Sequence, residues 1–358
     1  MKPRLLIISL SSYENLTDIN KWCQYLRDQY DITYLCKALV STPKHNNINI
    51  EGINIQCVPW SDRKIIRVIN FLYRALSETY SNYDICLIEH FPSCFIIKMF
   101  GGCNKYMLDI RTASVAKSPI KRFVEDTFLK LEAALFKNKT IIAEALADKF
   151  GINAQVLPVG ADSILCKNSN YSGLKLIYIG TLENRDIDKT IKGLSYFYES
   201  NHDRINLSYT IIGTGRNSEE NNLQELVDQL RLVDIVNILG YIKHEDLGMY
   251  LSDSNIGVSF IPLTSYFDFQ PPTKTFEYLL SGLPVIATKT HENRRVINDT
   301  NGVLIEDTPE DFCRGLELVC ERLNSYNSEL IRDDAREYSW ENITLNFLKP
   351  YLNSVLQQ

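Results

Sequence analysis

Short apolar runs recur along this chain, and segments whose apolar residues have helical spacing separate them. In residues 1–170 the runs are Arg4–Ser9, Asp31–Cys36, Ile48–Val58, Asp84–Glu89, Tyr106–Ile110, Thr140–Ile142 and Gln155–Pro158. In the remainder they are Leu174–Gly180, Leu207–Gly213, Ile235–Gly240, Asn255–Pro262, Pro284–Thr288 and Gly302–Ile305. Strands that are apolar on both faces and alternate with helices predict parallel sheets covered by helices on both sides. We therefore expect an α/β protein.

The length of the chain predicts two domains. With 358 residues, 45% of them hydrophobic, it exceeds what one hydrophobic core usually covers. Residues 161–173 are polar, rich in Asn and Ser and without periodicity, so we place the linker there. We expect a doubly wound, Rossmann-like domain over residues 1–165, a second over 174–340, and a C-terminal helix at 341–358 that packs back on the first. Two such domains facing each other leave a cleft at the C-terminal ends of their strands, where these sheets bind ligands.

Local sequence argues against several other classes of protein. No run of about eighteen apolar residues is present, and the opening MKPRLLIISLSS turns polar too early for a signal peptide. The nine cysteines are scattered, without Cys-x-x-Cys or clustered Cys/His spacing, which argues against a disulfide framework and a structural zinc. We therefore expect a cytoplasmic protein.

The segment QPPTKTFEYLLSGLPVIATK, residues 270–289, is the most informative of the chain. Pro272 can open a helix, and Gly282 followed by proline ends it before the strand PVIAT. The free N–H groups and the positive dipole end at the start of this helix suit a diphosphate. Lys274 adds a positive charge there, and Glu277, one turn further on, can accept hydrogen bonds from a ribose diol. The alternative is a surface helix with an incidental Lys and Glu.

Two further strands end in glycine. The strand IYIG ends at Gly180 and is followed by a loop that contains Arg185, while TIIGTG ends at Gly213 and Gly215. Loops without side-chain bulk let a ligand approach the backbone. No Gly-x-Gly-x-x-Gly fingerprint lies near the N-terminus, which argues against a nicotinamide-dependent dehydrogenase.

The order of these motifs resembles the C-terminal domain of retaining glycosyltransferases with the GT-B fold. The motifs are the strand that ends in Gly-Thr-Leu with a basic residue in the next loop, then IIGTG, VNILGYIKHEDLGMYLSDSNIGVSFIP, PPTKTFEYLLSGLPVIA and YSWENI. More narrowly, the chain is similar to the large bacterial family, of the glycosyl transferases group 1 type, that builds lipopolysaccharide, capsule and exopolysaccharide. LPVGAD, residues 157–162, resembles the P-N-G-V-D turn that precedes the linker in that family.

The resemblance implies a nucleotide-sugar site in the C-terminal domain. The residues carried over to it are Gly180, Thr181, Arg185, Gly213, Ile242, Lys274, Thr275 and Glu277. The loop after Gly180 and the two residues at the helix start would contact the diphosphate, the backbone of Ile242 would recognise the base, and Glu277 would bind the ribose.

Two positions depart from the family's pattern. Thr181 stands where many members have an Arg, which leaves Arg185 and Lys274 as the clear cations of the site. Phe269 stands where many members have a second Glu, although members with a P-x-K-x-x-E-Y pattern often lack that Glu as well.

In the first half, three candidate catalytic residues lie at strand ends. His90 follows the strand DICLIE, and Asp109 and Arg111 belong to the strand end MLDIRT. Both places would face the cleft of a doubly wound domain, and the family often has a His near the donor sugar after one of these strands. The alternatives are a structural His90 and an ion pair between Asp109 and Arg111.

The reaction implied by the resemblance moves a sugar from a UDP- or GDP-sugar to a hydroxyl of a glycan or lipid-linked acceptor, with retention at the anomeric carbon. Such an enzyme, of the hexosyltransferase type, would need no metal and no cofactor, because the helix dipole, Arg185 and Lys274 neutralise the diphosphate. The alternatives are a nucleotide-sugar epimerase of the same fold and a non-catalytic binding scaffold. Nothing in the sequence indicates a nucleic acid partner.

The uneven distribution of charge suggests a further partner. Residues 1–170 contain 21 Lys and Arg against 16 Asp and Glu, whereas residues 171–358 contain 17 against 28. Two segments rich in apolar residues carry the basic clusters Arg63, Lys64, Arg67 and Arg74, and Lys117, Lys121, Arg122 and Lys130. A basic helix with an apolar face can make a peripheral contact with an anionic membrane. The same pattern fits a helix that packs on its own sheet and keeps a solvated basic rim.

Overall fold

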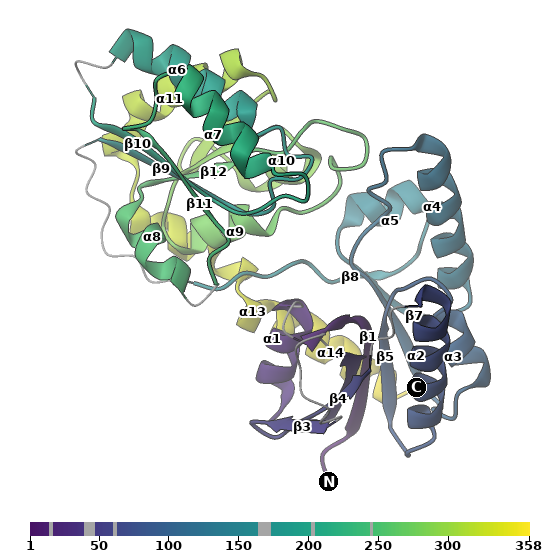
Figure 1. The fold of residues 1–358 in the computed structure, drawn as a ribbon. Coiled ribbons are helices and arrows are strands. Elements are labelled where there is room, and N and C mark those ends of the chain that lie inside the picture. The colour runs from purple at the N-terminus through teal and green to yellow at the C-terminus, as the bar shows by residue number, and fades with distance from the viewer. Residues whose placement is uncertain (14–16, 39–46, 60–62, 164–172, 202–204, 244–245) are drawn as a thin grey trace. The chain divides into compact units, whose positions relative to one another are not determined.

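The computed structural model describes the chain except residues 14–16, 39–46, 60–62, 164–172, 202–204 and 244–245. The chain divides into two compact units: unit 1 contains residues 1–160 and 340–358, and unit 2 contains residues 161–339. Each unit has a mainly parallel sheet with helices on both faces (Figure 1), so the predicted α/β class with two Rossmann-like domains is confirmed. The predicted linker, residues 161–173, falls mostly outside the described residues.

Unit 1 is built on an eight-stranded sheet. Its strands are β1 (Arg4–Ser12), β2 (Asp31–Lys37), β3 (Asn47–Ile50), β4 (Ile53–Val58), β5 (Ile85–Glu89), β6 (Tyr106–Ile110), β7 (Asn138–Ile141) and β8 (Gln155–Val156). The order in space is β3-β4-β2-β1-β5-β6-β7-β8, and every neighbouring pair except β3 and β4 is parallel. The central strand β1 is buried from Leu5 to Ile8, as its apolar run predicts.

The prediction of one strand over Ile48–Val58 is wrong, because the chain turns back within it. Glu51 and Gly52 have positive φ angles of 51° and 88°, a conformation typical of two-residue hairpin turns. β3 and β4 therefore pair antiparallel, with Ile50 opposite Ile53. The apolar alternation runs through both strands and so hides the turn between them.

The helices of unit 1 cover both faces of this sheet. They are α1 (Thr17–Leu26), α2 (Lys64–Thr79), α3 (Phe95–Phe100), α4 (Pro119–Ala134), α5 (Glu144–Phe150), α13 (Trp340–Ile343) and α14 (Lys349–Leu356), with a π-helical turn, η5 (Thr344–Leu348), before the last. Figure 1 shows α2 and α3 on one side of the sheet and α1, α13 and α14 on the other. The C-terminal helices are tied to this unit by hydrogen bonds from Tyr30 to Asn353 (2.7 Å) and from the N–H of Lys139 to Tyr351 (2.9 Å).

Unit 2 is built on a six-stranded sheet in which all neighbouring pairs are parallel. Its strands are β9 (Leu174–Ile179), β10 (Leu207–Ile212), β11 (Val236–Gly240), β12 (Ile256–Ser259), β13 (Val285–Thr288) and β14 (Gly302–Ile305). Their order, β11-β10-β9-β12-β13-β14, reverses direction beside β9. Crevices that bind ligands form at such reversals, outside the C-terminal ends of the strands.

The helices of unit 2 alternate with these strands. They are α6 (Asp188–Asn201), α7 (Glu219–Gln229), α8 (Leu247–Asp253), α9 (Thr273–Leu280), α10 (His291–Val296), α11 (Pro309–Arg322) and α12 (Ser328–Asp334), with short 3-10 turns η3 (Leu323–Ser325) and η4 (Ala335–Tyr338). Helix α9 follows Pro272 and stops before Gly282, whose φ of 78° ends it in the predicted way. Within the described parts of both units, no helix combines the length and the apolar character needed to cross a membrane.

Candidate functional site

Helix α9 is fixed to the unit 2 sheet by polar side chains as well as by its apolar face. The hydroxyl of Tyr278 accepts a hydrogen bond from the N–H of Ile179, at the end of β9, over 2.8 Å. The buried hydroxyl of Thr275 lies 2.8 Å from that of Ser259 on β12 and donates to the side-chain oxygen of Asn293, 2.9 Å away. These bonds hold the start of the helix beside the ends of β9 and β12.

Two glycines let the ends of β9 and β10 approach each other closely. Gly180 and Gly213 have φ angles of 146° and 154°, which L side chains rarely adopt. A Cβ atom on Gly213 would lie 1.8 Å from the carbonyl oxygen of Gly180, and one on Gly180 would lie 3.0 Å from Nζ of Lys274. Glycine is therefore required at both strand ends, and the lysine of α9 lies directly over the first of them.

Lys274 is a buried cation that lacks ordinary partners. Its Nζ has no hydrogen-bond partner among the residues described and lies 3.9 Å from the centroid of the Tyr178 ring. Burial, together with the nearby charge of Arg185, lowers the pKa of Lys274 to about 7, while Glu277 opposes that shift. The aromatic face replaces only part of the hydration that the ammonium group has lost. An anion brought to this place would restore the charged form.

Arg185 is the second cation at this edge of the sheet. Its guanidinium carbon lies 4.2 Å from the centroid of the Phe267 ring, and burial lowers the pKa of Arg185. The flanking residues Asn184 and Asp186 have φ angles of 57° and 52°, a conformation that Asn and Asp tolerate better than most residues. Two neighbouring cations that are both disfavoured by burial indicate a binding place for an anion.

The two threonines predicted at this site have different surroundings. Thr181 is exposed directly after Gly180, and its carbonyl accepts a hydrogen bond from the hydroxyl of Tyr178 over 2.7 Å. Thr275 has its hydroxyl bonded within the unit, and its N–H donates to the carbonyl of Pro272 over 3.0 Å. Thr181 can therefore reach a ligand, whereas Thr275 anchors the helix.

The remaining residues predicted in unit 2 lie at the same edge. Glu277 is half-buried one helical turn after Lys274. Ile242 follows β11, which is joined to β10 where the N–H of Gly213 donates to the carbonyl of Gly240 over 2.8 Å. Seven of the predicted residues thus lie where β9 and β10 end and α9 begins: Gly180, Thr181, Arg185, Gly213, Lys274, Thr275 and Glu277. The eighth, Ile242, follows the end of the neighbouring strand β11.

In unit 1, Asp109 and Arg111 belong to a buried polar network at the C-terminal ends of the strands. Arg111 donates to the carboxylate of Asp18 and to the carbonyl of Leu157 (2.8 Å), and its Nε lies 3.8 Å from the Asp109 carboxylate. Asp109 is fully buried, and its other oxygen accepts a hydrogen bond from Thr140 over 2.6 Å. Burial raises the pKa of Asp109 to about 6. Asp109 thus lies beside Arg111 and has no contact with solvent.

Glu89 is a member of this network that sequence analysis missed. Its carboxyl group accepts a hydrogen bond from the hydroxyl of Ser9. Burial raises the pKa of Glu89 to about 7, the hydrogen bond from Ser9 opposes that rise, and the charge of Asp109 adds to it. A carboxyl group that titrates near neutral pH at a strand end can serve as a general acid or base. Its position in the sequence, as the last residue of β5 and directly before His90, could have indicated a role for Glu89.

The side chain of His90 is bonded to α4 instead of to that network. Its Nε2 lies 3.0 Å from a carboxylate oxygen of Glu132, whose other oxygen accepts a hydrogen bond from the N–H of Phe95 over 3.3 Å. The thiol of Cys94 completes a group of three whose ligand atoms all lie within 4.8 Å of one another. Imidazole, thiolate and carboxylate are all zinc ligands. In the parts of the chain that are described, this is the group that could hold a metal ion.

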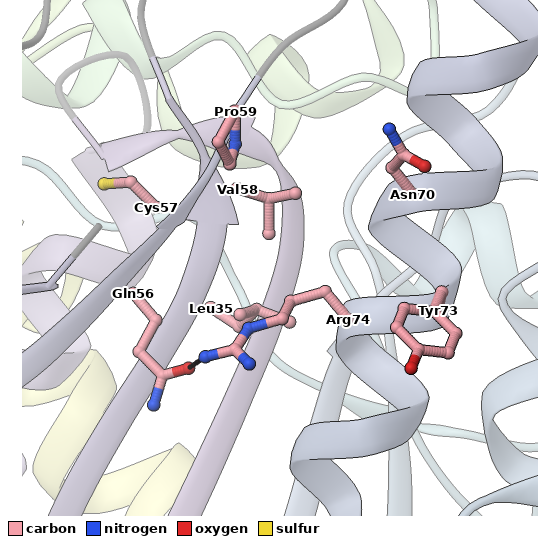
Figure 2. A pocket seen from close by; sticks show the side chains of 8 residues that line it. All are labelled: Leu35, Gln56, Cys57, Val58, Pro59, Asn70, Tyr73 and Arg74. Carbon is pink, nitrogen blue, oxygen red and sulfur yellow. Dashed lines mark hydrogen bonds between the residues drawn. The ribbon is translucent and has the colours of Figure 1, made fainter. Parts of the chain in front are cut away.

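Unit 1 also contains a cavity of about 500 Å³ between its strands and α2. It is lined by Leu35, Gln56, Cys57, Val58, Pro59, Asn70, Tyr73 and Arg74. Figure 2 shows Arg74 extending from α2 toward Gln56 on β4, to which its guanidinium group donates over 3.3 Å. Gln56 in turn donates to Glu78 over 3.1 Å, so the polar wall of the cavity is a connected set of side chains. None of the site residues predicted from the sequence lines it.

A family model matches part of the chain. Residues 173–322 match the family model described as "Glycosyl transferases group 1", which confirms the resemblance inferred from the motifs. No curated protein matches the sequence.

Solved structures show the same fold over the full length. Sucrose-phosphate synthase from Thermosynechococcus elongatus has a TM-score of 0.76 and 14% identity, covering 100% of both chains. Anabaena HepE in complex with UDP and glucose has a TM-score of 0.73 and 12% identity, over 98% of this chain and 99% of that one. The lipopolysaccharide outer core galactosyltransferase WaaB has a TM-score of 0.70 and 13% identity over the same shares. Together with the family match, these likenesses support glycosyltransferase activity.

Proposed function

We propose that the protein transfers a sugar from a nucleotide-sugar donor to a hydroxyl group of a glycan or lipid-linked acceptor, with retention of the anomeric configuration. The observation that carries the proposal is the buried Nζ of Lys274, which has no hydrogen-bond partner in the described structure and lies at the start of α9 near Arg185. A diphosphate supplies the anionic oxygens that these two cations and the helix N–H groups require. UDP- and GDP-sugars both carry that group, and the presence of UDP in the HepE structure favours a UDP-sugar.

In this proposal the donor lies across the C-terminal ends of β9 and β10. Lys274 and Arg185 hold the diphosphate, and the glycine ends at Gly180 and Gly213 allow it to approach the backbone. The Glu277 carboxylate accepts hydrogen bonds from the ribose hydroxyls, and the backbone beside Ile242 recognises the base. Thr181 is exposed and would face the sugar, while Thr275 positions the helix.

The chemistry then rests on positioning and charge. The bond between the anomeric carbon and the diphosphate oxygen breaks, and a bond to the acceptor oxygen forms on the same face of the sugar. The leaving diphosphate takes the proton of the acceptor hydroxyl, so no side-chain nucleophile is needed. The negative charge that develops on the diphosphate is stabilised by Lys274, Arg185 and the dipole of α9, the work that a metal ion does in other enzymes.

We assign the acceptor side of the reaction to unit 1. His90 and Arg111 would contact the transferred sugar or the acceptor, with Asp109 and Glu132 positioning them. The cavity shown in Figure 2 has amide and guanidinium groups for sugar hydroxyls and the ring of Tyr73 for a sugar face. Hexosyl transfer in the synthesis of a surface polysaccharide, at the cytoplasmic face of a membrane, is the role that best fits the resemblance.

A nucleotide-sugar epimerase of the same fold is the second candidate, because one observation favours it. Glu89, whose burial raises its pKa to about 7, lies next to His90 in the chain. An epimerase needs such groups to remove and return a proton on the sugar.

Incubation of the protein with a panel of UDP- and GDP-sugars separates these functions. A transferase is expected to release free nucleotide slowly from one donor without acceptor, and NMR would show the sugar first appearing in the donor's anomeric configuration. An epimerase would instead produce a stereoisomer still attached to its nucleotide. A protein that binds one nucleotide sugar, raising its melting temperature, yet yields neither product would be a non-catalytic scaffold. If no nucleotide sugar raises the melting temperature, the proposed site is wrong.

A further inference from the structure

Three potential metal ligands converge at one place in unit 1. The imidazole of His90, the thiol of Cys94 and the carboxylate of Glu132 each offer a ligand atom, and these atoms all lie within 4.8 Å of one another. His90 follows the end of β5, Cys94 directly precedes α3, and Glu132 lies in the last turn of α4. The fold therefore assembles the group from three separate elements.

Backbone hydrogen bonds hold His90 and Cys94 in position. The N–H of His90 donates to the carbonyl of Asp109 over 2.8 Å, which keeps the residue at the edge of the sheet. The N–H of Cys94 donates to the carbonyl of Phe91 over 3.0 Å, in a turn where Ser93 has a φ of 76°. This turn brings the thiol back toward the imidazole ring four residues earlier in the chain.

Glu132 is a buried carboxylate with little positive charge around it. Its exposed fraction is 2%, and its ion-pair partner in the described part of the chain is His90, which is charged only when protonated. One carboxylate oxygen lies 3.0 Å from Nε2 of His90, and the other accepts a hydrogen bond from the N–H of Phe95 over 3.3 Å. Carboxylates are rarely buried this deeply without a cation or a metal ion as partner. A divalent cation would supply the missing charge.

The chemistry of the three ligands favours zinc. Magnesium and calcium prefer oxygen ligands, whereas zinc binds thiolate, imidazole and carboxylate together in a tetrahedral arrangement. Bond lengths of about 2.0 to 2.3 Å place the ligand atoms of such a site about 3.4 to 3.6 Å apart, so small side-chain rotations would form it here. With the thiol of Cys94 and the carboxyl group of Glu132 ionised, two negative charges balance those of the ion, and the buried site is neutral overall.

We propose that His90, Cys94 and Glu132 bind a zinc ion that inhibits sugar transfer. The ion reaches the group past the His90 side chain, which is 13% exposed, the thiol proton leaves to solvent, and water takes the fourth position.

Inhibition follows from the two nitrogens of the imidazole ring. Without zinc, the Glu132 carboxylate accepts the proton of Nε2 on His90, so Nδ1 can accept a hydrogen bond from a sugar hydroxyl. With zinc on Nε2, Nδ1 must carry the ring proton and becomes a donor. This part of the inference rests on the proposed function, because it requires that His90 contact the transferred sugar or the acceptor.

Competition with a chromogenic chelator measures zinc binding to the full-length protein. Cys94→Ala should weaken it by about a hundredfold or more, because loss of a group that only supports a metal ligand already costs about 10- to 100-fold in affinity. Cys86→Ala is the matched control, since Cys86 is equally buried on β5 and lies outside the group, and it should bind zinc like wild type.

Two further measurements separate loss of a ligand from loss of folding. Melting temperatures are compared without metal, and Glu132→Gln, which keeps the size of the side chain, should also weaken zinc binding. Cobalt in place of zinc should give a thiolate charge-transfer band in wild type, and this band should be absent from Cys94→Ala.

Transfer is then assayed in EDTA and in buffered zinc. Wild type and Cys86→Ala should be active in EDTA and lose activity as zinc is added, whereas Cys94→Ala should keep its activity in both conditions.

Four results would overturn the inference. They are zinc affinity in wild type no higher than in Cys94→Ala, a cobalt complex without the thiolate band, higher transfer activity with zinc than without it, and equal inhibition of Cys94→Ala, which would mean that zinc acts on the donor diphosphate. If wild type transfers no sugar in EDTA while zinc binding depends on Cys94 and Glu132, the proposed function fails and the zinc site stands.

Discussion

The Nζ atom of Lys274 lies 3.9 Å from the centre of the Tyr178 ring, so the cation of the proposed donor site rests on an aromatic face in place of water. Tyr178 is itself fixed, because its hydroxyl donates to the carbonyl of Thr181 over 2.7 Å. The two side chains therefore lie together beneath the start of α9, where we propose that the diphosphate binds. Lys274 has a pKa of about 7 there, and its ionisation should respond to the ligand.

We expect binding of UDP or GDP to take up a proton above neutral pH. Burial lowers the pKa of Lys274 to about 7 without ligand, and a bound diphosphate raises that pKa. The complex then holds more protons than the free protein, so affinity should fall as pH rises from about 7 toward the pKa in the complex. Calorimetry in buffers of different ionisation enthalpy measures this uptake. Lys274→Met should abolish it, and an uptake that persists in that variant would belong to another group.

Glu277→Ala should weaken nucleotide binding by about tenfold or more. A charge-assisted hydrogen bond is worth about 1.5 to 3 kcal/mol, and the variant loses those to the ribose. Glu277→Gln, which keeps one acceptor oxygen without charge, should fall between alanine and wild type. Calorimetric titration checks the order. A folded alanine variant that binds its nucleotide as tightly as wild type would remove Glu277 from the site.

Arg185→Ala should weaken binding of the nucleoside diphosphate and leave binding of the nucleoside nearly unchanged, because its charge pairs only with phosphate. Arg216 offers a matched control in the next loop, where its guanidinium group is exposed and 3.3 Å from Glu183. Arg216→Ala should affect neither ligand. Equal losses for both ligands in the Arg185 variant would place that side chain away from the diphosphate.

Transfer activity should survive treatment with EDTA. The proposed site neutralises the diphosphate with Lys274, Arg185 and the dipole of α9, so it makes no demand on a divalent ion. Complete loss that magnesium reverses would contradict this. If EDTA abolishes activity, only zinc restores it, and the Cys94→Ser variant is insensitive to EDTA, then the group of His90, Cys94 and Glu132 holds a metal ion.

If His90 acts in the reaction, Glu132 should act through it. The 3.0 Å contact to a buried carboxylate fixes the orientation of the imidazole ring. Glu132→Gln keeps the size of the side chain, so we expect a lower kcat with little change in KM. In a double-mutant cycle with His90→Ala the two effects should couple by about 1 kcal/mol. Effects on kcat that add fully, with melting temperatures unchanged, would show that Glu132 does not act through His90.

Much of the fold could be predicted because its signals are local. The strands of both sheets are apolar on both faces. Helix α9 is bounded by Pro272 and Gly282, and each of these residues affects only the helical turn next to it. The hairpin of β3 and β4 escaped prediction because the turn at Glu51 and Gly52 lies inside a continuous apolar alternation.

The site was predictable only where a motif of known spacing carried it. Lys274 and Glu277 belong to one such motif, but the ring of Tyr178 beneath the lysine comes from another strand. His90 and Glu132 are 42 residues apart, and no local pattern joins them. The apolar spacing on α4 left two interpretations open because periodicity alone does not tell which face of a helix packs on the sheet. In the structure the buried residues of α4 are Leu129, Glu132 and Ala133, and Ile120 and Phe123 are exposed.

Unit 1 is completed by residues 340–358, although the whole of unit 2 lies between them and Gly160 in the sequence. The ring of Trp340 fills the space beside Gly160, where a Cβ atom would be 2.6 Å from it. During synthesis the eight strands of unit 1 and α1 leave the ribosome before unit 2, and residues 340–358, which complete the cover on the side of α1, leave it after unit 2. Unit 2 is continuous and can fold while unit 1 waits. Nascent unit 1 therefore keeps part of an apolar sheet face open to water until residues 340–358 have been made, and an exposed apolar face of this kind favours aggregation.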